Sequence, residues 1–178
     1  MNARSLFGFG ARQQTRPLGA SGANCRTCLK CNLQSNLDMK KRILLVDDDR
    51  AVRESLGRVL TMENFLVLPA ADGIEALNIA VATKLDLVIL DLNMPRQSGW
   101  DTFEKLTREN PFLPVIIITA RSGQLFTSLG AGVAALLEKP LDMARLMTTI
   151  EAVLAESGEV RLARVAGRSA EFHYAPPV

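Results

Sequence analysis

Acidic side chains directly follow two apolar segments of this 178-residue chain. Asp47, Asp48 and Asp49 come after the apolar run of residues 43–46, and Asp91 ends the apolar run "LDLVILD". Ionised carboxylates side by side repel one another, and burial raises their pKa, so such a cluster needs either a cation or different roles for its members. Carboxylates with no His or Cys nearby favour a hard divalent cation, and this pattern predicts Mg²⁺ rather than zinc or iron.

A hydroxyl group and an ammonium group follow later apolar segments, at Thr119 and Lys139. Both suit an anion such as a phosphoryl group, whose spread charge is offset by a metal ion and an ammonium group together. A carboxylate also serves as a nucleophile that forms an aspartyl-phosphate. Asp91 is the best candidate for that role, because it ends the most apolar run and is followed by a loop able to fold over a metal ion.

These side chains need a scaffold, and apolar runs that alternate with amphipathic segments predict one. The predicted strands are residues 43–46, 65–68, 85–91, 115–119 and 134–138. The predicted helices are residues 50–62, 71–83, 99–109, a weak helix at 123–131, and a final helix after "KPLD". Five strands each followed by a helix indicate an α/β fold with a doubly wound parallel sheet. The flavodoxin-like strand order 2-1-3-4-5 brings the polar residues together at the carboxyl ends of the strands, where such sheets bind ligands.

Three local signals refine the predicted elements. Asp49 and Asp72 stand where a helix begins, and each is expected to cap or start the helix that follows it. Asn64 follows the first helix and tolerates the left-handed backbone that ends many helices. Residues 123–131 are poor helix formers, so the fourth helix is expected to be short or irregular.

Charge and apolar content divide the chain into three parts. Residues 1–38 carry five Lys or Arg against one Asp and have no hydrophobic period, which predicts a disordered N-terminal extension. Residues 39–156 form the predicted domain, and residues 157–178 form a C-terminal tail too short for a DNA-binding output domain. Residues 39–157 carry thirteen basic against sixteen acidic side chains, so direct DNA binding is not expected. The lack of a long apolar run or a signal-peptide pattern predicts a cytoplasmic protein without membrane contact.

All three cysteines lie in the N-terminal motif "CRTCLKC", at Cys25, Cys28 and Cys31. This spacing occurs in iron–sulfur and zinc sites, but a fourth ligand is missing nearby and His173 is the only histidine of the chain. The motif therefore does not favour a metal site, and no disulfide is expected in the predicted core. An alternative is that Met39 is the true start of the protein.

Five blocks of the sequence, in order, resemble a response regulator receiver domain of the CheY-like type. They are "ILLVDDDRAVRESL", "DGIEAL", "DLVILDLNMPRQSGW", "PVIIITA" and "LLEKPLD", and the resemblance covers about residues 41–155. The resemblance implies a single-domain phosphoacceptor of two-component signalling. It implies that Asp91 takes a phosphoryl group from the phosphohistidine of a sensor histidine kinase or a histidine phosphotransfer protein, and that the domain then docks to a downstream protein effector.

The same resemblance implies how the metal and the phosphoryl group are held. Asp47 and Asp48 are the acidic pair that holds Mg²⁺ together with Asp91, and the backbone carbonyl of Asn93 completes the metal site. Thr119 bonds the phosphoryl oxygens as a switch hydroxyl.

Further positions follow from the same resemblance. Lys139 pairs with the phosphoryl group, and the Lys139–Pro140 peptide bond is expected to be cis. Leu136 stands where the family often places an aromatic residue that rotates as an output signal, so that form of switch is in doubt here. Arg121 and Asn93 stand where the family tunes the rate of dephosphorylation, although both are equally readable as ordinary loop residues.

Two other classes of protein were weighed against this one. A Mg²⁺-dependent phosphatase with an Asp nucleophile typically needs a second Asp two residues later as general acid, and Asn93 stands there instead. A flavin-binding module needs a Ser/Thr/Gly-rich phosphate loop after the first strand, where this chain has carboxylates. The sequence therefore predicts a signalling module that dephosphorylates itself at most, and no enzyme with a separate substrate.

Overall fold

The computed structural model describes residues 40–94, 98–120, 127–128, 131–168 and 172–177. The expected disordered extension at residues 1–38 and its cysteine motif lie outside the described residues, as do Arg121 and most of the expected helix at 123–131.

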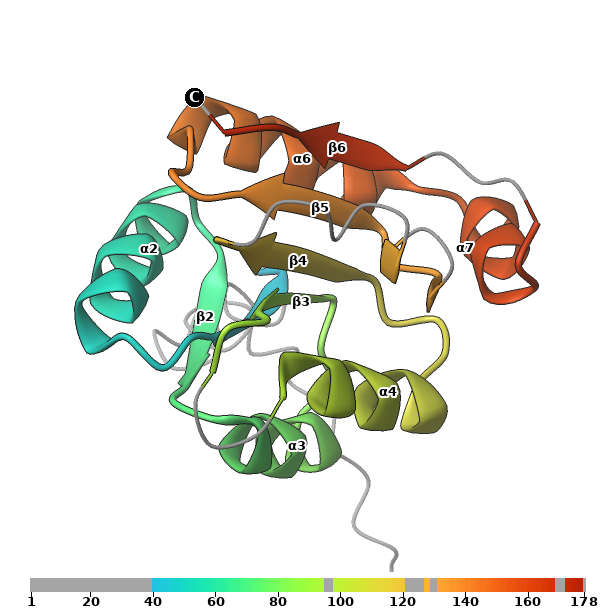
Figure 1. Ribbon diagram of the computed structural model, residues 1–178, viewed down its shortest axis with the longest axis horizontal. Coiled ribbons are helices and arrows are strands. Elements are labelled where there is room, and N and C mark those ends of the chain that lie inside the picture. Colours follow the sequence, from blue (N-terminus) through green and yellow to red (C-terminus); the bar gives the residue numbers. More distant parts are fainter. Residues whose placement is uncertain (1–39, 95–97, 121–126, 129–130, 169–171, 178) are drawn as a thin grey trace, which may run out of the picture.

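Within the described residues, six strands form one parallel sheet in the order β2-β1-β3-β4-β5-β6 (Figure 1). They are β1 (Arg42–Val46), β2 (Leu66–Ala70), β3 (Leu87–Asp91), β4 (Val115–Thr119), β5 (Ala135–Glu138) and β6 (His173–Ala175). The predicted fold class and the order of the first five strands are confirmed. The sixth strand was not predicted, because three residues are too few to produce a hydrophobic period.

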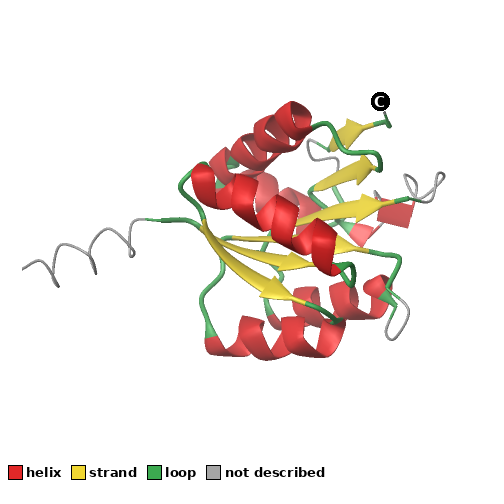
Figure 2. Ribbon diagram, turned by 90° about the vertical axis from the view of Figure 1, so that its left-hand side faces the viewer, coloured by secondary structure: helices red, strands yellow, loops and turns green. Residues whose placement is uncertain are grey.

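Helices cover both faces of the sheet (Figure 2). They are α2 (Arg50–Met62), α3 (Gly73–Ala82), α4 (Gly99–Glu109), α6 (Met143–Ala155) and α7 (Gly158–Val165). An Asp or Ser side chain caps the amino end of each one and accepts hydrogen bonds from the first free backbone N–H groups. The expected capping roles of Asp49 and Asp72 are confirmed, and Asn64 has the expected positive φ, 67°.

Alternate residues of the central strands point to opposite faces, which creates two apolar cores. On one face, β1 and β3 side chains such as Leu44 and Leu90 pack with Phe103 of α4. On the other face, Leu45 packs in the core that Ile150 of α6 completes. Burial of each such side chain contributes roughly 2 kcal/mol, so the strands are held firmly and their carboxyl ends have fixed positions.

Candidate functional site

The polar residues expected from the sequence lie at one edge of the sheet, where four neighbouring strands end. Asp47 and Asp48 follow β1, and Asp91 is the last residue of β3. Thr119 is the last residue of β4, and Lys139 follows β5. They meet because parallel pairing aligns the strand ends, with Asp91 beside Ile118 and Thr119 beside Glu138 in register.

Three carboxylates form a cluster at this edge. Asp47, Asp48 and Asp91 each offer an oxygen within 4.8 Å of the others. Asp47 and Asp91 are 2% and 4% exposed, whereas Asp48 faces solvent. Two buried carboxylates and one exposed carboxylate make an open acidic site that a hydrated cation can reach.

Backbone N–H groups orient both buried carboxylates. The N–H of Asp49 donates to Asp47 Oδ1 at 2.8 Å, and the N–H of Asn93 donates to Asp91 Oδ1 at 2.9 Å. Each bond comes from the residue two positions later, so the turn after each strand holds the carboxylate that precedes it. Asp49 therefore supports the site through its backbone while its side chain caps α2.

Lys139 joins the two buried carboxylates. Its Nζ atom donates to Asp91 Oδ2 at 2.6 Å and to Asp47 Oδ2 at 3.1 Å. Burial lowers the pKa of Lys139, but the hydrogen bonds to Asp91 and Asp47 outweigh it and hold that pKa above its usual value. The charged form of Lys139 is therefore favoured, and its Nζ atom lies beside the Asp91 carboxylate.

The pKa of Asp47 is raised above its usual value in spite of this lysine. Burial is the largest cause, and the hydrogen bonds from Lys139 and from the Asp49 backbone only partly oppose it. The charge of Asp91 raises the pKa of Asp47 further. The carboxylate of Asp47 is therefore held in an environment that a further cation would improve.

Thr119 is fully buried, and its Oγ1 atom accepts a hydrogen bond of 3.3 Å from the side-chain amide of Asn93. Its carbonyl oxygen also accepts a 2.8 Å hydrogen bond from the N–H of Lys139. The ends of β3, β4 and β5 are thus connected directly through Asn93, Thr119 and Lys139. The Lys139–Pro140 bond is cis, as expected, and Leu136 is fully buried in β5.

Two residues that support the site were missed by the sequence reasoning. Gly99, the first residue of α4, lies so close to the loop after β3 that an added Cβ would stand 2.6 Å from the carbonyl oxygen of Asp91 and 2.5 Å from the Cα of Leu92. Arg53 of α2 donates from Nη1 to the carbonyl oxygen of Asp47 at 2.7 Å. The "SG" pair at the start of α4 was a visible signal for Gly99, whereas no sequence pattern marks Arg53.

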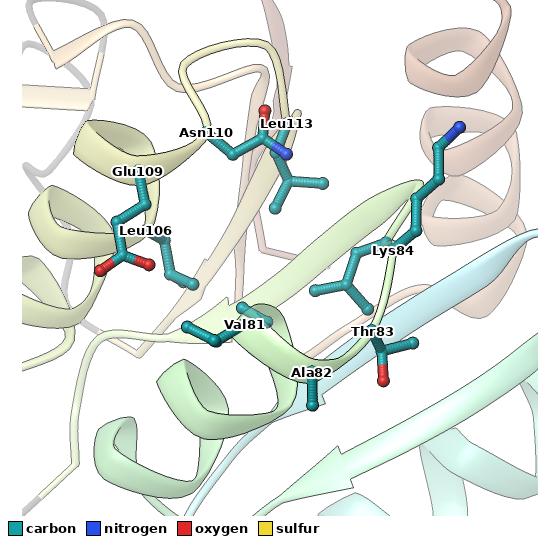
Figure 3. Close-up of a pocket in the computed structure, with 10 residues that line it drawn as sticks. Val81, Ala82, Thr83, Lys84, Leu106, Glu109, Asn110 and Leu113 are labelled. Carbon is teal, nitrogen blue, oxygen red and sulfur yellow. The ribbon is translucent and has the colours of Figure 1, made fainter.

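A cavity of about 210 Å³ lies at the opposite, amino edge of the sheet (Figure 3). Its walls come from the carboxyl ends of α3 and α4 and from the segments that lead into β3 and β4, with Val81, Lys84, Leu106 and Glu109 among them. The cavity shares no lining residue with the carboxylate cluster.

Comparison with known proteins agrees with this geometry. A family model described as the response regulator receiver domain matches residues 43–151. The response regulators MprA of Mycobacterium sp. (strain KMS) and Mycobacterium tuberculosis (strain ATCC 25177 / H37Ra) are 40% and 39% identical over 118 residues, which is 65% of this chain and 51% of each relative. This chain thus spans about half the length of the curated relatives it matches.

Solved structures agree as well. A CheY-like receiver domain protein from Methanospirillum hungatei JF-1 has 31% identity and a TM-score of 0.62, over 65% of this chain and 94% of that one. The response regulator TrrA from Thermotoga maritima, in complex with Mg²⁺ and BeF, has 31% identity and a TM-score of 0.59, over 64% and 98% of the two chains.

The chain belongs to the response regulator receiver domain family. Receiver domains are phosphoacceptor modules of two-component systems, and the family works with histidine kinases and effectors. Its members typically bind Mg²⁺ at acidic residues. No helix in the described part of the chain has the length and apolar character needed to span a bilayer.

Proposed function

We propose that Asp91 accepts a phosphoryl group from the phosphohistidine of a sensor histidine kinase or a histidine phosphotransfer protein, with Mg²⁺ as cofactor. The observation that carries this proposal is the pairing of Asp91 with Lys139 Nζ at 2.6 Å, inside a cluster of three carboxylates. A nucleophile, a metal-binding acidic group and a fixed cation are the parts that phosphoryl transfer needs.

In the transfer, an Asp91 carboxylate oxygen forms a bond to phosphorus, and the bond from phosphorus to the imidazole nitrogen breaks. The electron pair of the broken bond stays on that nitrogen, and a proton from solvent or from the donor protein completes the neutral imidazole. Asp91 is suited to this role because the Asn93 N–H and the Lys139 ammonium hold its two oxygens in place.

Asp47, Asp48 and Asp91, with the backbone carbonyl of Asn93, are the proposed ligands of Mg²⁺. Oxygen donors without His or Cys fit this hard cation, which keeps several waters and shares phosphate oxygens. The raised pKa of buried Asp47 supports a cation here, since its carboxylate lacks full compensation from Lys139 alone. When bound, Mg²⁺ supplies positive charge next to the phosphoryl oxygens.

We propose that the side chains of Lys139 and Thr119 donate hydrogen bonds to the phosphoryl oxygens. The ammonium of Lys139 already bonds Asp91, so it is placed to bond a group attached there. The hydroxyl of Thr119 is buried at the end of the adjacent strand and is able to donate to an anion.

We further propose that the module acts in the cytoplasm and signals by docking to a downstream protein effector, without itself binding DNA or a membrane. The slight acidity of residues 39–157 supports this output, because a DNA-binding surface requires clustered basic charge. Any dephosphorylation is expected to be slow and self-catalysed.

The direct test is to incubate the full chain with Mg²⁺ and acetyl phosphate and to weigh the product by mass spectrometry. The wild type should gain the mass of one phosphoryl group in an acid-stable, base-labile bond, and Asp91→Asn should gain none. Glu151→Gln, which removes an exposed carboxylate on α6, is the matched control and should behave like the wild type. An adduct that persists in Asp91→Asn would refute the assignment, and rapid continuous release of phosphate from acetyl phosphate would favour the phosphatase alternative.

A further inference from the structure

The C-terminal segment after α6 adds two elements beyond the region that matches the receiver family. α7 follows α6 closely, and β6 returns to pair in parallel with β5 (Figure 1). Tyr174 of β6 lies opposite Leu136 of β5 in register. β6 therefore occupies the edge of β5, whose backbone groups would otherwise be free to pair with another strand.

The tip of this segment is bonded to a residue next to the phosphoacceptor site. The Tyr174 hydroxyl donates to Glu138 Oε1 at 3.2 Å. Glu138 ends β5, is only 9% exposed, and directly precedes Lys139. A continuous path thus runs from Asp91 through Lys139 and Glu138 to Tyr174.

The other end of the segment is anchored differently. Arg164 of α7 forms an ion pair with Glu156, and both side chains are almost fully buried. The backbone of Arg164 also packs against Gly132, which lies before β5 and has a φ of 77°. A buried ion pair is costly to separate, so α7 is held firmly. By contrast, β6 is held by three paired residues and one side-chain hydrogen bond.

We propose that β6 is a latch on the edge of β5, closed in the present arrangement and loosened when Asp91 carries a phosphoryl group. This proposal rests on the proposed function. In the present arrangement Lys139 bonds the carboxylates of Asp91 and Asp47 directly. A phosphoryl group extends outward from the Asp91 carboxylate, and Lys139 follows it together with the adjoining Glu138.

This movement takes the Glu138 carboxylate out of the position in which it accepts the hydrogen bond from the Tyr174 hydroxyl. β6 is a short edge element, since the strand is three residues long and Tyr174 is 42% exposed, while Ala175 packs against the core. Short edge strands detach at a low free energy cost. A small shift at the end of β5 is therefore enough to change the fraction of molecules in which β6 is detached.

The chain has one tyrosine, so incorporation of 3-fluorotyrosine places a single fluorine label at Tyr174. Fluorine NMR and amide hydrogen exchange of residues 173–175 are measured on the full chain with Mg²⁺, before and after acetyl phosphate. Mass spectrometry of the same sample reports the phosphoryl group on Asp91. Phosphorylation should move the fluorine resonance toward that of the unfolded chain and speed exchange of these amides roughly tenfold.

Tyr174→Phe removes only the hydroxyl and is the matched variant. Its 173–175 amides should exchange as fast without acetyl phosphate as those of the phosphorylated wild type, with little further change on phosphorylation.

The outcomes separate the two proposals. A wild type that carries the phosphoryl mass while the fluorine resonance and β6 exchange stay unchanged overturns the latch and leaves the proposed function intact. Slower exchange of β6 after phosphorylation also overturns it. A wild type that gains no phosphoryl mass on Asp91 overturns the proposed function, and the latch with it.

Discussion

A lysine pairs with aspartate at both ends of the parallel strands, at the amino edge and at the carboxyl edge of the sheet. The pKa of the aspartate is lowered at the amino edge, at Asp86, and raised at the carboxyl edge, at Asp47. At the amino edge, Lys41 Nζ lies 3.0 Å from Asp86 Oδ1, and the side chains are 55% and 28% exposed. At the carboxyl edge, Lys139 lies 2.6 Å from Asp91 and 3.1 Å from Asp47, whose side chains are 5% and 3% exposed. Contact distances are similar, and burial is what differs.

The pKa values show what burial changes. Burial of Asp86 raises its pKa, but the Arg42 N–H and Lys41 outweigh it, and the pKa of Asp86 ends below its usual value. For Asp47, burial outweighs Lys139 and the backbone N–H, and the pKa ends above its usual value. Asp86 is compensated by its neighbours, whereas the carboxylate of Asp47 is left under-compensated by Lys139, a feature found often at functional sites.

The largest expected difference is in phosphorylation. Lys139→Met should lower the rate of acetyl phosphate labelling roughly 10²–10³-fold, because one fixed charge on the transferring group is lost. Lys41→Met removes an equivalent ion pair at the amino edge and should leave the rate unchanged. Labelling is followed by mass spectrometry, and equal rates in the two variants would show that the carboxyl-edge lysine has no special role.

The next largest expected effect comes from adding one methyl group at Gly99, beside the loop that follows Asp91. Gly99→Ala should destabilise the fold by about 2 kcal/mol and slow labelling, because the new Cβ forces the loop after Asp91 to move. Gly158 begins α7 and has no atom within 4 Å of an added Cβ, so Gly158→Ala should be neutral or slightly stabilising. Urea unfolding measures both, and a neutral Gly99→Ala would mean that the loop is not held by this contact.

The edges should also differ in the sign of a stability change. Without Mg²⁺ at neutral pH, Asp47→Asn should raise the unfolding free energy by about 1 kcal/mol while it abolishes Mg²⁺ binding. Asp86→Asn should lower the unfolding free energy by about 1 kcal/mol, because a favourable charged pair is lost. The same sign in both variants would contradict the contrast between the edges.

The smallest expected effect is a difference in pH windows. Asp47 binds its proton more tightly in the folded state, so its destabilising effect is full above its raised pKa and disappears as pH falls toward 3.8. Asp86 has a lowered pKa, so its stabilising effect is present above 3.8 and is lost only as pH falls through that lowered value. Urea unfolding in EDTA, over a pH series, should show the Asp47→Asn difference closing at higher pH than the Asp86→Asn difference.

Much of the scaffold was predictable because its signals are local. The helices at residues 50–62 and 99–109 and the strand at 115–119 have the predicted bounds. Capping side chains and uninterrupted apolar runs determine such elements within a few neighbouring residues. Strand β5 starts one residue later than predicted, and β2 is shifted along the chain by one to two residues, because strand ends depend on the pairing partner.

The sequence by itself determined the types and order of the residues at the carboxyl edge, and the alternation of strands and helices that carries them. Only the tertiary structure decided that Lys139 bridges Asp91 and Asp47, and that burial outweighs this bridge in raising the pKa of Asp47. The pairing of β6 with β5 was also decided by the tertiary structure, because a three-residue segment is too short to predict a strand from its sequence. The physical reason is that burial and strand pairing depend on atoms far apart in the chain, whereas periodicity and capping depend on neighbours.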